Sequence, residues 1–190
     1  MKKCSIAALL LLLSTGLCFG QAPRAALNAP HGSDVYVGAI ATFPDFEQFG
    51  TFRLYGGEVA YTRNLSTRWA GIASGAAVFG STFAVTQFSG TAGVKFNFLT
   101  GGFRPYATTQ IGYAYQSSNG MYAASHHPVL RPHTTDTEDG LTYRLGFGAD
   151  LQLSRRVYWR VAQWDIQPLP WGRHTPFYSN FSSGIGYRFF

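Results

Sequence analysis

The chain has 190 residues, of which 46% are hydrophobic, 16% aromatic and only 13% charged, and it contains 22 glycines. This balance argues against a soluble helical domain and is typical of strands in which apolar and polar residues alternate. The formal net charge is +6, but the basic residues are scattered along the chain rather than clustered, so we expect no nucleic-acid partner.

The first twenty residues have the three parts of a secretory signal peptide. Lys2 and Lys3 form the positive start, and Ile6 to Leu13 is an apolar run that is too short to span a bilayer, which needs ~20 residues. Small residues follow and predict cleavage between Gly20 and Gln21. The alternative is a lipoprotein cut before Cys18, but Leu17 is larger than the residue usually found before such a cysteine.

Both cysteines, Cys4 and Cys18, lie within the predicted signal peptide, so the mature chain is exported without disulfides. It contains no apolar run of the length of a transmembrane helix. If the chain enters a membrane, only a closed barrel satisfies its backbone there. We therefore expect a flexible lead over residues 21–33 and an all-β, eight-stranded antiparallel transmembrane barrel over residues 34–190.

The first three predicted strands alternate less regularly than the later ones. The first is Asp34 to Phe43, and the second is Phe52 to Thr62, where a change of parity at Gly56-Gly57 predicts a β-bulge. The third, Trp69 to Phe79, is rich in small residues, and its facing is ambiguous.

The next three strands are Gln87 to Phe98, Arg104 to Tyr115 and Leu141 to Leu153. In the last of these, every odd-numbered residue is apolar and the even-numbered residues include Arg144 and Asp150. Such long alternation is typical of a strand with one face toward lipid and the other toward a polar interior.

The last two strands are Val157 to Ile166, with a bulge predicted near Ala162-Gln163, and Asn180 to Phe189. The connections alternate between short ones and long ones, as in outer-membrane barrels with short periplasmic turns. The long connections include Gln116–Asp139 and Gln167–Pro176, which we expect to be surface loops.

Three motifs make the chain resemble the OmpA-like and OmpX-type family of eight-stranded outer-membrane barrels. They are Gly56-Gly57-Glu58-Val59-Ala60-Tyr61, Arg104-Pro105-Tyr106 and the terminal Gly184-Ile185-Gly186-Tyr187-Arg188-Phe189. The resemblance covers nearly all of the mature chain and implies a cell-envelope protein of the bacterial outer membrane, with membrane lipid and lipopolysaccharide around it. It also implies that the barrel-assembly machinery reads the terminal aromatic strand, here Phe181, Ile185, Tyr187, Phe189 and Phe190.

The charged residues of inward parity are the main candidate site. An eight-stranded barrel is only wide enough inside for side chains, so charges packed there must pair. We expect a lumen network that plugs the barrel; it consists of Glu58, Lys95, Arg104, Arg144, Asp150, Arg160, Asp165 and Arg188. The alternative is a porin-like, narrow gated pathway for ions or protons.

Other chemistry is less well supported by the sequence. His126, His127, His133 and His174 lie in the long loops but lack a compact metal-ligand spacing, so we expect no metal and no cofactor. A lipid A-modifying barrel enzyme needs a Ser, a His and an acid together. The candidates are Ser179, His174 and either Glu138 or Asp165, but the His-any-Ser pattern of the deacylase type is missing.

The aromatic residues near strand ends, Trp171 among them, fit interfacial girdles better than a sugar-binding shelf. We therefore expect a monomeric, non-enzymatic barrel with no catalytic residue. Its role is structural or surface-interacting, with the long loops as the contact surface for a partner that the sequence does not identify. A narrow pore and a lipid A acyl hydrolase or transferase are the alternatives.

Overall fold

The computed structural model describes residues 32–44, 53–80, 85–119, 135–168 and 177–189. These residues form a closed antiparallel barrel in which the strands follow one another in chain order. The strands are β1 (Ser33–Pro44), β2 (Leu54–Asn64), β3 (Trp69–Gly80), β4 (Val85–Asn97), β5 (Phe103–Asn119), β6 (Thr135–Gln152), β7 (Val157–Pro168) and β8 (Phe177–Phe189). No helix in these ranges is long and apolar enough to cross a membrane.

The barrel is inside out compared with a soluble protein. Large apolar side chains lie on its outer surface, with Ile111 66% exposed, Leu141 75% and Phe147 59%. Polar and charged side chains of the intervening positions are buried inside. This arrangement suits a hydrocarbon solvent, and it confirms the predicted lipid-facing alternation of β4, β5, β6 and β8.

The two chain-terminal strands close the barrel by pairing with each other. Ser33 lies opposite Phe189, and the register continues without a break to Pro44 opposite Tyr178. Closure removes the free sheet edges that would leave backbone groups unsatisfied in lipid. The predicted all-β, eight-stranded antiparallel fold is thus confirmed.

One of the two predicted bulges is present. In β7, Arg160 faces Gly184 and Gln163 faces Ser182, so Val161 and Ala162 together oppose one residue of β8. The bulge predicted at Gly56-Gly57 in β2 is wrong, because both neighbouring ladders run through it in regular register. The apparent change of parity arises because Leu54 is an inward-facing apolar residue that is fully buried.

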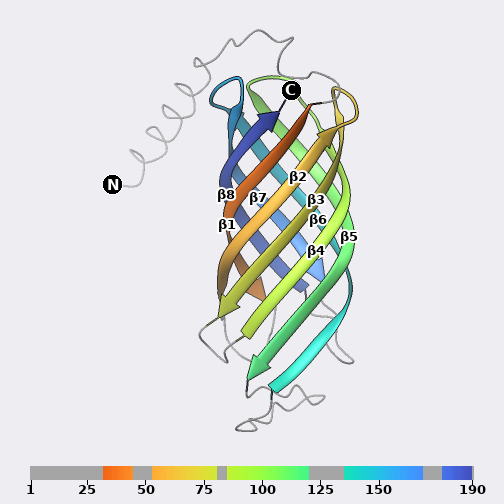
Figure 1. The fold of residues 1–190 in the computed structure, drawn as a ribbon, viewed down its shortest axis with the longest axis vertical. Coiled ribbons are helices and arrows are strands. Elements are labelled where there is room, and N and C mark those ends of the chain that lie inside the picture. Colours follow the sequence, from red (N-terminus) through yellow and green to blue (C-terminus); the bar gives the residue numbers. More distant parts are fainter. Residues whose placement is uncertain (1–31, 45–52, 81–84, 120–134, 169–176, 190) are drawn as a thin grey trace, which may run out of the picture.

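All the short turns lie at one end of the barrel, together with the C-terminus (Figure 1). They join β2 to β3, β4 to β5 and β6 to β7. By the usual arrangement of outer-membrane barrels this end is periplasmic and the other is extracellular.

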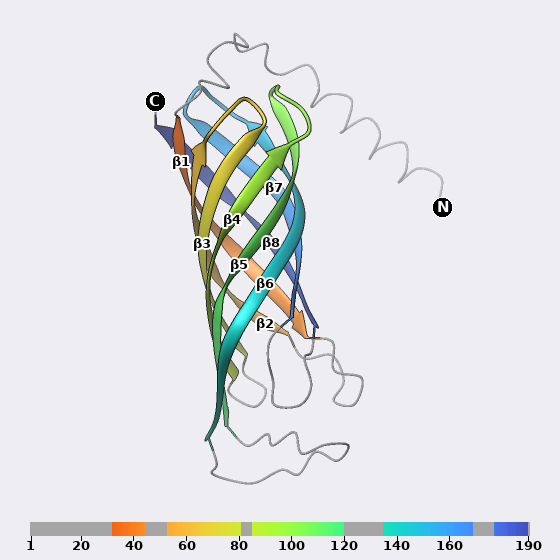
Figure 2. The ribbon, with the colours of Figure 1, turned by 90° about the vertical axis from the view of Figure 1, so that its right-hand side faces the viewer.

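The extracellular end is uneven, because β5 and β6 continue past the other strands (Figure 2). They remain paired as far as Asn119 opposite Thr135. The loop predicted over Gln116–Asp139 is therefore wrong at both ends, where the chain is strand. Alternation through Gln116–Asn119 and Thr135–Asp139 is weak, because polar residues occupy both faces.

Candidate functional site

The predicted lumen charges all lie inside the barrel. None of Glu58, Lys95, Arg104, Arg144, Asp150, Arg160, Asp165 and Arg188 is more than 6% exposed. They come from β2, β4, β5, β6, β7 and β8, where each occupies the inward parity of its strand. Two ion-pair clusters form among them.

The first cluster is centred on Arg144 of β6. Its Nη1 lies 2.6 Å from Oε1 of Glu58 on β2, and its Nη2 lies 2.8 Å from Oδ2 of Asp165 on β7. The amide of Gln163 donates to both carboxylate oxygens of Asp165, at 2.9 and 2.8 Å. One guanidinium therefore neutralises two buried carboxylates from different walls of the barrel.

The second cluster reverses this ratio, with two cations around Asp150. Lys95 Nζ lies 2.5 Å from Oδ2 of Asp150, and Arg160 Nε lies 3.2 Å from Oδ1. Each cation also lies over a tyrosine ring. Lys95 Nζ is 3.8 Å from the ring centroid of Tyr106, and Arg160 Cζ is 3.9 Å from that of Tyr36. Aromatic faces stabilise cations that have lost their water.

Nearer the periplasmic end, Arg104 and Arg188 share the amide oxygen of Gln152, each at 3.3 Å. Asp34, which the predicted network omitted, is 4% exposed and accepts a hydrogen bond of 3.0 Å from Tyr158. Its parity on the first predicted strand, shared with Tyr36, could have identified it. With Asp34 included, four buried carboxylates face five buried cations.

Toward the extracellular end the lumen also contains buried apolar side chains, which the sequence analysis missed. They form one buried cluster of Ile40, Leu54, Val78, Val85, Ala114 and Tyr178. Inward apolar residues near strand ends look like lipid-facing ones in a sequence, so alternation alone does not reveal them. This apolar layer lies on the extracellular side of the ion pairs, and buried polar groups share its level, such as Gln116, which accepts a hydrogen bond from Tyr178 at 3.1 Å.

Inward tyrosines pack over glycines on neighbouring positions of the wall. A Cβ on Gly148 would lie 2.5 Å from Cζ of Tyr106, and one on Gly186 would lie 2.0 Å from Cζ of Tyr158. These glycines are needed because the rings occupy the space of their missing side chains. The rings, amides and ion pairs are thus all buried on the inward face of the described strands.

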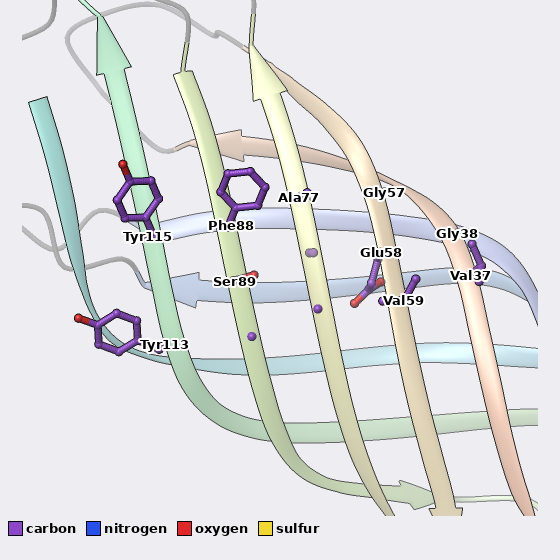
Figure 3. A pocket seen from close by; sticks show the side chains of 13 residues that line it. Val37, Gly38, Gly57, Glu58, Val59, Ala77, Phe88, Ser89, Tyr113 and Tyr115 are labelled. Atoms are coloured by element: carbon purple, nitrogen blue, oxygen red, sulfur yellow. The ribbon is translucent and has the colours of Figure 1, made fainter. Parts of the chain in front are cut away.

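The outer wall carries a shallow hollow of about 670 Å³ across β1 to β5 (Figure 3). Its floor consists of small residues, including Gly57, Gly75 and Gly90, and its sides include Val59 and Phe88. A Cβ on any of these three glycines meets no protein atom closer than 3.8 Å. The hollow therefore lies mainly on the lipid-facing surface, and Glu58 is also among its lining residues.

The extended part of β6 has a partner on only one side. Among the described residues, β7 pairs with β6 only from Leu145 opposite Ile166 onward, so Thr135 to Leu141 is paired with β5 alone. Just below, the hydroxyl of Thr142 donates to the carbonyl of Pro168 at 2.5 Å. On the outward face the hydroxyl of Tyr113 donates to the carboxylate of Asp139, which ties the two strands together.

The predicted assembly strand has the expected facing. Phe181, Ile185, Tyr187 and Phe189 are all on the outer surface of β8, between 40% and 50% exposed. Trp69, Trp159, Trp164, Tyr61, Tyr113, Phe98 and Phe177 also lie outward. Phe190 and Trp171 fall outside the described residues.

The structure does not bring together Asp165 and Ser179, the candidate enzyme residues, and the candidate metal residues fall outside its described part. The histidines at 126, 127, 133 and 174 lie outside the described residues, as does the predicted signal peptide, and the described residues contain no cluster of metal-ligating side chains. Asp165 is fully buried in the lumen against Arg144. Ser179 has the outward parity of β8, so these two members of the predicted triad lie on opposite faces of the wall.

Comparison with solved structures finds barrels of the same kind. Neisserial surface protein A aligns with a TM-score of 0.65 at 10% identity, over 83% of this chain and 97% of the other. Ail, the attachment invasion locus protein of Yersinia pestis, aligns with a TM-score of 0.60 at 16% identity, over 84% and 99%. OprG, an outer membrane protein of Pseudomonas aeruginosa, gives 0.54 at 14% identity, over 84% and 96%.

No family model matches the chain. No curated protein sequence matches it either. The structural likeness confirms the predicted resemblance at the level of the fold, which is that of the eight-stranded barrels of the bacterial outer membrane. None of the three names is that of an enzyme.

Proposed function

We propose that this chain is a closed, non-conducting outer-membrane barrel that presents the β5–β6 hairpin as a contact surface outside the cell. The barrel is the rigid anchor, and the hairpin is the part that meets a partner. The proposal has two components, a sealed lumen and an exposed strand edge, and each rests on separate residues.

The lumen contains two different barriers in series. An ion that passes the charge network must displace a cation from a buried carboxylate, as at Asp150, where Lys95 lies 2.5 Å away. It must then pass the apolar layer around Leu54 and Val78, whose side chains do not replace its hydration shell. Both steps are unfavourable, which supports an anchoring role rather than a pore.

The observation that carries the contact role is the unpaired edge of β6 from Thr135 to Leu141 among the described residues. An exposed edge offers a row of backbone donors and acceptors to an added strand. In lipid such an edge would be unfavourable, but this one projects beyond the extracellular end of the barrel (Figure 2). The geometry supports β-strand addition by an extended polypeptide.

The charge of the hairpin indicates which polypeptide fits. Asp139 is exposed and Glu138 is half-buried on β6, and no basic residue lies in the described part of the hairpin beyond Tyr113. A cationic, extended segment complements this edge. Two of the similar barrels have names that refer to the cell surface or to attachment, which is consistent with a contact role.

The test uses the full mature protein refolded in nanodiscs and a fluorescent peptide in which lysine alternates with valine. We expect saturable binding, measured by anisotropy, that a proline in the centre of the peptide abolishes because it removes a ladder donor. Thr137→Pro in the protein should abolish binding in the same way, while Arg53→Gln at another strand end should not. Equal binding of the proline peptide, or unchanged binding by the Thr137→Pro protein, would overturn the proposal.

A further inference from the structure

We infer that the periplasmic rim of the barrel binds the headgroup phosphates of anionic phospholipids in the inner leaflet of the outer membrane. Exposed arginines occupy two of the three short turns and the strand end beside one of them. They are Arg63, Arg68, Arg155 and Arg156. The charge and placement of these side chains are independent of the lumen and of the extracellular hairpin.

Charge is distributed asymmetrically between the two ends. The exposed or half-exposed carboxylates of the described residues, Glu138 and Asp139, lie at the extracellular end. At the periplasmic end the nearest side-chain carboxylate in the described ranges is that of Asp34, which is 4% exposed and bound to Tyr158. The rim arginines therefore face their surroundings without a neighbouring exposed acid on the described part of the wall.

The register places two of these arginines on either side of β8 and β1. Arg63 on β2 lies opposite Ser33, which lies opposite Phe189. On the other side, Arg156 donates from Nη1 to the hydroxyl of Tyr187 at 3.2 Å. Neighbouring strands are about 4.8 Å apart, so the two guanidiniums flank a section of wall about three strands wide.

The section between them carries outward aromatic rings at the depth of a membrane interface. The rings of Tyr187 and Phe189 are 5.0 Å apart, and the hydroxyl of Tyr61 lies 2.8 Å from that of Ser33. Rings with an apolar body and a polar tip are typical of the headgroup level. Arg63 has outward parity on β2 and Arg156 contacts the outward Tyr187, so both are placed for lipid phosphates rather than for the cell-wall polymer below the membrane.

Guanidinium and phosphate form paired, charge-assisted hydrogen bonds. Each basic residue close to an anionic membrane surface strengthens binding about fivefold. Four such residues around one rim should enrich anionic lipid in the annulus strongly, and salt should weaken the enrichment.

The chain has its own reporters for this test, because Trp69 follows Arg68 and Trp159 lies outward on β7 near Arg156. In a Trp164→Phe, Trp171→Phe background, these two indoles report the lipids around the rim. The protein is refolded in vesicles that contain brominated phosphatidylglycerol or brominated phosphatidylcholine, each diluted in unbrominated phosphatidylcholine. Quenching then measures which headgroup is enriched.

We expect stronger quenching by phosphatidylglycerol at low salt, and loss of this preference on changing all four rim arginines to glutamine. Changing all four to lysine should keep most of it, because the charge remains. Arg53→Gln, at the extracellular end, is the matched control and should change nothing. The pairwise variants Arg63→Gln/Arg156→Gln and Arg68→Gln/Arg155→Gln replace the fourfold variant if it does not fold. Arg63→Gln/Arg156→Gln should lose more of the lipid preference, because these two arginines flank the aromatic section.

Three results would overturn the inference. One is equal quenching by both lipids in the unmodified rim, and another is a preference that survives removal of the arginines. The third is sedimentation of the protein with purified peptidoglycan sacculi that depends on the arginines, without any lipid preference. That outcome would assign the rim to the cell wall instead.

Discussion

Arg144 on β6 and Glu58 on β2 meet across the lumen, with Nη1 and Oε1 2.6 Å apart. β2 and β6 are opposite each other in the closed strand order. The pair therefore braces two walls that share no backbone hydrogen bonds. Both side chains are 1% exposed, so neither can regain water if its partner is removed.

Replacing Glu58 with glutamine should destabilise the barrel by about 2 kcal/mol, because it removes a buried charge-assisted hydrogen bond of Arg144 while Asp165 still neutralises the guanidinium. The measurement is the free energy of unfolding in urea with the protein in lipid vesicles. The matched experiment is a double-mutant cycle with Arg144→Met. Strictly additive losses in the two single variants would show that the pair does not brace the walls.

The cluster around Asp150 predicts that loss of the shared carboxylate destabilises the barrel more than loss of one of its cations. Asp150→Asn removes the shared anion and leaves Lys95 and Arg160 both uncompensated, so we expect a loss of about 3–5 kcal/mol. Lys95→Met leaves Asp150 with Arg160 at 3.2 Å and should cost clearly less. The urea midpoint of Asp150→Asn should therefore be lower than that of Lys95→Met, and the reverse order would contradict the assigned contacts.

Two glycines of β4 should respond differently to alanine. A Cβ on Gly93 would lie 2.0 Å from the backbone oxygen of Thr109, whereas one on Gly90 meets nothing within 4 Å. Gly93→Ala should cost at least about 1–3 kcal/mol, because backbone must move, and Gly90→Ala should remain within about 0.5 kcal/mol. Heat-modifiability gels and urea unfolding report both variants. Equal stability of the two would mean that β4 and β5 are further apart at Gly93.

The alternation of apolar and polar residues predicted which face most residues of the strands occupy, because every second residue of a membrane strand faces lipid. Leu145, Phe147 and Arg144 could be assigned to their faces from β6 alone. The same rule misread β2, where Leu54 is apolar and inward, and it overlooked Asp34. The residue type that fits at an inward position depends on the side chains across the lumen. Which side chains those are depends on the register of all the strands.

The apolar layer, and the edge of β6 that has no partner among the described residues, both depend on the register of the strands. Ile40, Val78 and Tyr178 come from β1, β3 and β8 and meet only when the barrel closes. Among the described residues, β6 extends from Thr135 while the pairing of β7 with it begins only at Leu145 opposite Ile166, a difference that polar hairpin residues conceal in the sequence. In contrast, the bulge at Val161 and Ala162 was readable, because it reverses the facing of everything after it.

Planar-bilayer recording tests the central claim, a lumen sealed by two barriers in series, most directly. The refolded protein should give no unitary currents, and neither Leu54→Ser/Val78→Ser in the apolar layer nor Lys95→Ala/Arg160→Ala in the charge network should open it alone. Only the combination of both pairs should produce discrete, ohmic steps. Such steps from the unmodified protein would contradict the account.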